Sequence, residues 1–98
     1  MAILKINPQV YNDIQNIYDY ILKDGEGIAQ KQVAKIYEQI DTLILMPNLG
    51  ISLDTKIKTK TNYKMLVSEP YVIFYEIIEY YIEIVRVLDG RQNYSKLF

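Results

Sequence analysis

Residues 71–98 of this chain read YVIFYEIIEYYIEIVRVLDGRQNYSKLF and carry the strongest structural signal in the sequence. Two runs rich in β-branched and aromatic residues, YVIFYEI and YIEIVRV, are separated by three residues, which predicts a β-hairpin. Polar side chains crowd the tail GRQNYSKLF directly after the second run. Because proteins often place functional groups where a strand of a rigid scaffold ends, we expect the functional site near this tail.

Composition excludes several classes of protein. The 98 residues are half apolar, which suits one folded domain spanning residues 1–98. The absence of cysteine and histidine rules out disulfides and a histidine general base, and it argues against a zinc site. We therefore expect no metal and no cofactor. The sequence has no signal-peptide pattern and no long apolar run, which predicts a cytoplasmic protein.

Residues 7–47 predict two helices. Asn7 followed by Pro8 is typical of a helix start, and apolar residues then recur at helical spacing, at Val10, Ile14, Ile17 and Ile21. The sequence DGEG at residues 24–27 ends this helix. A second apolar stripe from Ala29 to Ile44 ends before Pro47. Helices joined by so short a connection form an αα-hairpin.

The apolar stripes of the helices need a sheet to cover them. Strands are expected at residues 3–6, 63–67, 71–77 and 82–88. The order β-αα-βββ predicts an α+β fold, with the two-helix hairpin on one face of a small, mostly antiparallel sheet. Alternation puts Val72 and Phe74 on one face and Ile73 and Tyr75 on the other. Because both sets are apolar, we expect the face without helices to be partly open and to receive a partner.

Charge is unevenly distributed along the chain. The net charge of −1 argues against general binding to nucleic acid, but DTKIKTKTNYK at residues 54–64 contains four lysines. These lysines form either a local cationic ridge or a solvated edge that discourages pairing between sheets. We expect Lys64 to lie on such an edge strand.

The element order, PNLG at residues 47–50, YVIFYEI, and above all IVRVLDGRQNY at residues 84–94 resemble the RelE/ParE superfamily. These proteins are the toxins of bacterial type II toxin–antitoxin modules. The similarity covers essentially the whole chain, and its strands are closest to the ParE-like branch. It implies a growth-arresting toxin that a cognate antitoxin neutralises by wrapping its surface.

RelE-like members resemble ribosome-dependent nucleases that cut messenger RNA. Such cleavage needs proton-transfer groups and cations around the phosphate. Matched by position, this resemblance makes Lys64, Arg91 and Tyr94 the catalytic candidates. Val72 and Leu66 stand where two family cations would be, which weakens the nuclease hypothesis.

ParE-like members are more similar to this chain in the strands, because they share an apolar residue at position 72 and an arginine in the last strand. They trap DNA gyrase on cleaved DNA and need no catalytic group of their own. This interpretation, which we favour, makes Arg86, Arg91 and Lys96 the target-binding candidates. Whether the chain is an enzyme depends on which branch it follows.

Simpler roles remain open for the same residues. Tyr94 could pack against the sheet edge with Leu97 and Phe98, and Arg91 could pair with Asp89. Outside the toxin class, the main alternative is a non-toxic binding module on the same fold.

Overall fold

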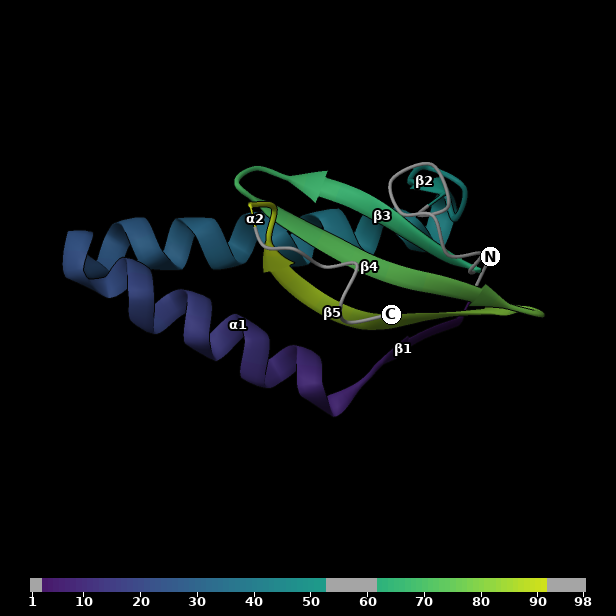
Figure 1. The fold of residues 1–98 in the computed structure, drawn as a ribbon, viewed down its shortest axis with the longest axis horizontal. Helices are drawn as coiled ribbons and strands as arrows, with labels where there is room; N and C mark the ends of the chain where they lie inside the picture. The colour runs from purple at the N-terminus through teal and green to yellow at the C-terminus, as the bar shows by residue number, and fades with distance from the viewer. Residues whose placement is uncertain (1–2, 53–61, 92–98) are drawn as a thin grey trace.

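The computed structural model describes residues 3–52 and 62–91. Its elements in chain order are β1 (Ile3–Ile6), α1 (Pro8–Ile21), the short 3-10 helix η1 (Leu22–Asp24), α2 (Glu26–Leu45), β2 (Ile51–Ser52), β3 (Tyr63–Ser68), β4 (Tyr71–Ile78) and β5 (Tyr81–Asp89). The predicted α+β class and the β-αα-βββ order are confirmed, with β2 as an addition (Figure 1).

Local chemistry explains where the helices begin and end. The Asn7 side chain accepts a hydrogen bond from the amide of Gln9 at 2.9 Å, which caps α1, and Pro8 is the first helical residue. Gly25 adopts a φ of 125°, which other residues rarely reach, and it separates η1 from α2. Neither α1 nor α2, nor the short η1, has the length and apolarity to cross a membrane.

The sheet has the strand order β1-β5-β4-β3-β2. β1 pairs parallel to β5, and the other neighbours are antiparallel. The expectation that Lys64 lies on an edge strand is therefore wrong, because β3 is flanked by β2 and β4. β2 contains only two residues, too few to produce a periodic signal in the sequence.

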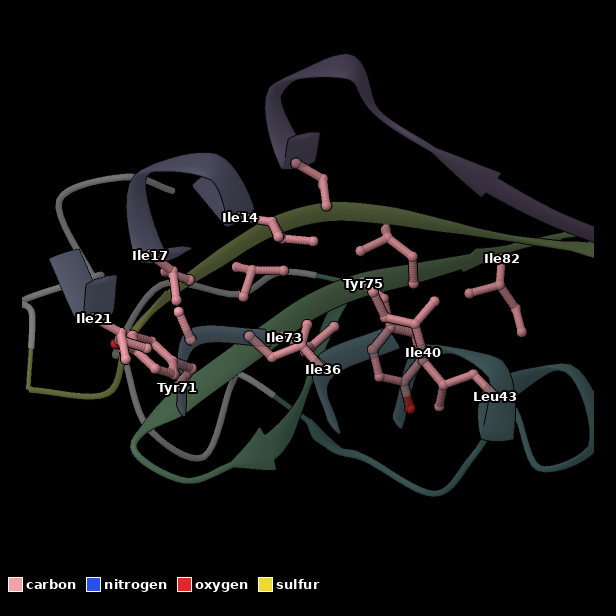
Figure 2. Packing of buried hydrophobic residues seen from close by; sticks show 14 residues of the cluster. Ile14, Ile17, Ile21, Ile36, Ile40, Leu43, Tyr71, Ile73, Tyr75 and Ile82 are labelled. Atoms are coloured by element: carbon pink, nitrogen blue, oxygen red, sulfur yellow. The ribbon is translucent and has the colours of Figure 1, made fainter. Parts of the chain in front are cut away.

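The main core lies between the sheet and the two helices (Figures 1 and 2). Tyr71, Ile73 and Tyr75 on β4 point toward the helices, so alternation predicted their shared face correctly. Figure 2 shows them packed against residues of both helices, namely Ile14, Ile17, Ile21, Ile36, Ile40 and Leu43. Burial of these aliphatic side chains is the main favourable contribution to folding.

The opposite face of the sheet carries a second apolar cluster formed by Met65, Val72, Phe74 and Leu88. Phe74 is fully buried and Val72 is 5% exposed, so the expectation of an open apolar face is wrong at the centre of the sheet. Among the described residues of this face, exposed apolar side chains lie toward the margin, where Val67 is 46% and Ile51 48% exposed.

The PNLG motif connects α2 to the sheet through a buried tyrosine. The Tyr75 hydroxyl accepts a hydrogen bond from the Gly50 amide at 2.8 Å and donates one to the Pro47 carbonyl at 2.9 Å. Burial raises the pKa of Tyr75, although the bond from Gly50 acts in the other direction. A Cβ at position 50 would lie 2.6 Å from the Met65 carbonyl and 2.7 Å from the Tyr75 hydroxyl oxygen, so the site requires glycine.

Candidate functional site

The site begins where β1 stops covering β5. Ile6, the last residue of β1, pairs with Ile84, and the Asn7 amide donates to the Ile84 carbonyl at 3.0 Å. β5 continues to Asp89, and none of the described strands pairs with this part of it on that side. Figure 1 shows α1 lying alongside this part of β5.

A β-bulge determines which β5 side chains face the core. Phe74 pairs with Arg86 but the next residue, Tyr75, pairs with Ile84, so Val85 is an extra residue in β5. As a result, Ile84 and Val87 both enter the helix-side core, although they are three residues apart. Arg86 is left beside the bulge, at the edge that faces α1.

Asp13 on α1 holds Arg86 and the edge of β5 together. One carboxylate oxygen, Oδ2, accepts from Arg86 Nε at 2.8 Å and from the Val87 amide at 3.0 Å, while Oδ1 accepts from Arg86 Nη2 at 2.9 Å. The Asp13 side chain is 4% exposed and that of Arg86 29%. The hydrogen bond that Arg86 donates to the Asp13 carboxylate raises the pKa of Arg86, and burial opposes this effect. Asp13 thus satisfies a strand-edge donor that β1 no longer reaches.

A second ion pair lies at the end of β5. Asp89 accepts from Arg91 Nε at 3.0 Å, from Arg91 Nη2 at 2.6 Å and from the Arg91 amide at 2.9 Å. The hydrogen bonds from Arg91 lower the pKa of Asp89 to about 2. Gly90 allows the tight turn, because its amide donates to the Pro70 carbonyl at 2.8 Å and a Cβ there would lie 3.1 Å from that oxygen.

The two ion pairs lie on the walls of one open groove of about 450 Å³ between α1 and β5, which we call the α1/β5 groove. Ile17 and Tyr20 from α1 and Tyr71 from β4 supply apolar surface between them. The groove therefore combines apolar side chains with two guanidinium groups.

The predicted site residues do not all meet. Arg86 and Arg91 line the α1/β5 groove together. Lys64 lies on β3, opposite Ser52 and Tyr75, and does not line the groove. Tyr94 and Lys96, like Lys56, Lys58 and Lys60, fall outside the described residues.

Sequence reasoning missed Asp13, although the signal was present. Asp13 lies between Val10, Ile14 and Ile17, within the apolar stripe of the first helix. A lone carboxylate on an apolar helix face indicates a buried ionic or hydrogen-bonding partner, since burying it unpaired would be very costly. Its partner could not be identified because Arg86 is 73 positions away in the sequence.

Comparison with known proteins agrees with this architecture. No curated protein matched the sequence. A solved chain from the chromosomal ParDE TA system of P. aeruginosa has the same fold, with a TM-score of 0.77, 24% sequence identity, and coverage of 91% of this chain and 96% of that chain. The family described as "ParE toxin of type II toxin-antitoxin system, parDE" matches residues 4–94. The chain therefore belongs to the ParE toxin family of type II toxin–antitoxin systems.

Proposed function

We propose that this toxin arrests growth by binding DNA gyrase rather than by cutting RNA. The supporting observation is the arrangement of its cationic side chains. Arg86 and Arg91 are each engaged by a carboxylate in one groove, and Lys64 is elsewhere on the sheet. A surface that binds a target protein needs such oriented side chains but no group that carries out a chemical step.

A nuclease would need its cations and proton-transfer groups around a single phosphodiester, within hydrogen-bond reach. In the strand register, Lys64 of β3 lies opposite Tyr75 of β4. Asp89, two residues before Arg91, lies opposite Tyr71 of the same strand. Four residues along a strand correspond to roughly 13 Å, and β4 also lies between the two positions. This separation favours the gyrase proposal over the RelE-like alternative.

Two further inferences follow from the family. A ParE toxin is paired with a cognate antitoxin, so such a protein is the expected partner of this chain. Gyrase and the ribosome both work in the bacterial cytoplasm, and we infer that the toxin acts there.

The test is to induce the chain in bacteria and follow thymidine and leucine incorporation in parallel. We expect thymidine incorporation to fall first, and purified toxin to inhibit DNA supercoiling by gyrase. An earlier fall in leucine incorporation would instead indicate the ribosome and the RelE-like activity. Unaffected growth would favour the non-toxic binding module.

Two variants sharpen this test. Arg91→Ala should reduce growth arrest if the α1/β5 groove contacts the target, and Lys35→Gln on the exposed side of α2 is the matched control.

Tyr94→Phe should have little effect on a gyrase poison. In a nuclease it should reduce activity by roughly tenfold or more, because it removes a proton donor.

A further inference from the structure

The α1/β5 groove contains every arginine of the chain. The full sequence has two arginines and nine lysines, and both Arg86 and Arg91 line this groove. None of the lysines in the described part of the chain does so. Arginine differs from lysine in presenting a planar set of N–H donors that binds a carboxylate or phosphate through two parallel hydrogen bonds.

Both arginines are held in the same way. Asp13 binds Nε and Nη2 of Arg86, and Asp89 binds Nε and Nη2 of Arg91. Each guanidinium has five N–H donors, so its Nη1 group and one Nη2 proton have no carboxylate partner within residues 3–52 and 62–91. The two aspartates thus orient the guanidiniums from one side and leave the opposite end, the Nη fork, available to a ligand.

Apolar side chains share the groove with the two arginines. Ile17, Tyr20 and Tyr71 line it, together with the polar Asn16. Arg86 and Asp89 are three residues apart on β5, roughly 10 Å in an extended strand. A ligand that engages both arginines therefore needs two acceptor groups spaced along the groove, and apolar groups on it can contact Ile17, Tyr20 and Tyr71.

We propose that the α1/β5 groove binds an acidic segment of the cognate antitoxin, with one carboxylate at each arginine fork and apolar side chains between them. A peptide suits this site better than nucleic acid. The chain has a net charge of −1, and Asp13 and Asp89 lie beside the arginines, whereas phosphate backbones are bound by surfaces of excess positive charge. The proposal rests on the pairing of toxin and antitoxin and does not depend on gyrase being the target.

The test measures fluorescence anisotropy with purified toxin and three labelled probes. The first is a peptide with two glutamates flanking Leu-Val-Leu, the second has glutamine in place of each glutamate, and the third is an oligothymidine of similar length. We expect the glutamate peptide to bind at least about tenfold more tightly than the glutamine peptide, as charged hydrogen bonds predict. Equal affinity for both peptides, or tighter binding of the oligothymidine, would overturn the proposal.

Variants then locate the binding site. Arg91→Lys should weaken glutamate-peptide binding by roughly tenfold at unchanged thermal stability, because the Arg91 side chain is 79% exposed. Lys35→Gln should bind like the wild type. Arg86→Lys should also weaken binding, but its ion pair with Asp13 is structural, so Arg91→Lys is decisive. Unchanged binding in Arg91→Lys would exclude the groove.

The cognate antitoxin itself provides the last step. Added unlabelled, it should displace the glutamate peptide from the toxin. Formation of the toxin–antitoxin complex without displacement would show that the antitoxin binds elsewhere. Because these assays contain neither gyrase nor ribosomes, their outcome is separate from that of the incorporation experiment.

Discussion

At the scale of single residues, Asp13 joins α1 to the edge of β5. Its carboxylate lies almost fully buried and accepts hydrogen bonds from the Arg86 side chain and the Val87 amide. Removing one partner of a buried ion pair costs more than the pair contributes, because the remaining charge stays desolvated.

Asp13→Asn should therefore destabilise the fold by roughly 2–4 kcal/mol, since the uncharged amide leaves Arg86 without its counter-charge. Urea unfolding measures this free energy. Asp19→Asn, at an exposed position of the same helix, is the matched control and should change stability by less than about 0.5 kcal/mol. Equal effects of the two variants would contradict the structural role of Asp13.

The Asp89–Arg91 pair predicts a pH dependence with a definite sign. Hydrogen bonds from Arg91 lower the Asp89 pKa from 3.8 to about 2 in the folded protein, so the pair stabilises the fold above the unfolded pKa. That contribution is lost as the pH falls from about 4 through about 2. Carboxyl chemical shifts should show Asp89 titrating near 2 in the wild type and closer to 3.8 in Arg91→Gln. An unchanged titration in that variant would rule out the ion pair in solution.

At the scale of elements, the contact between Tyr75 and the Pro47–Gly50 loop sets where α2 meets the sheet. A tyrosine hydroxyl buried on β4 satisfies one loop amide and one loop carbonyl. The loop backbone approaches so closely that position 50 has no room for a side chain.

Two glycine substitutions should therefore have opposite effects. Gly50→Ala places a Cβ against the Met65 carbonyl and the Tyr75 hydroxyl, and we expect a loss of roughly 1–3 kcal/mol. Gly27→Ala lies in α2 with no atom near its Cβ, and we expect a gain of roughly 0.5–1 kcal/mol from higher helix propensity. Urea unfolding of the two variants measures both changes in the free energy of unfolding. A neutral Gly50→Ala would mean that the loop can move away from Tyr75.

At the scale of the whole molecule, apolar side chains are exposed beyond the groove. They cluster in the sequence at the end of α2 and the start of β2, where exposure is 76% for Leu45, 51% for Met46, 45% for Leu49 and 48% for Ile51. Surfaces of this kind favour association with a partner, or aggregation when the partner is missing.

We therefore expect the chain expressed alone to arrest growth or to be poorly soluble, and co-expression with its antitoxin to reverse both effects. Growth curves and the soluble fraction after lysis measure the two outcomes. Leu45→Gln should raise the soluble fraction without the antitoxin if the exposed end of α2 causes aggregation. Cells that grow freely while containing soluble toxin would contradict this expectation.

The sequence by itself determined the order of the elements other than β2, and which side chains of α1, α2 and β4 share a face. Asn7-Pro8, the helical recurrence from Val10 to Ile21, and the alternation in β4 are local patterns, set by capping, helical spacing and side-chain orientation within a few residues. The toxin family followed from motifs of the same kind, in PNLG and in the last strand. Local patterns also placed Arg86 and Arg91 close together along the chain.

Only the tertiary structure decided how these arginines are used. Alternation from Ile84 alone would put Arg86 on the core face and Val87 outside, but the bulge at Val85 reverses both. β1 ends at Ile6, opposite Ile84, and beyond that point Asp13 on α1 takes the place of β1 beside β5 and holds Arg86. Bulges, strand length and contacts across 73 positions depend on how the packed elements fit together, and a short stretch of sequence cannot encode that fit.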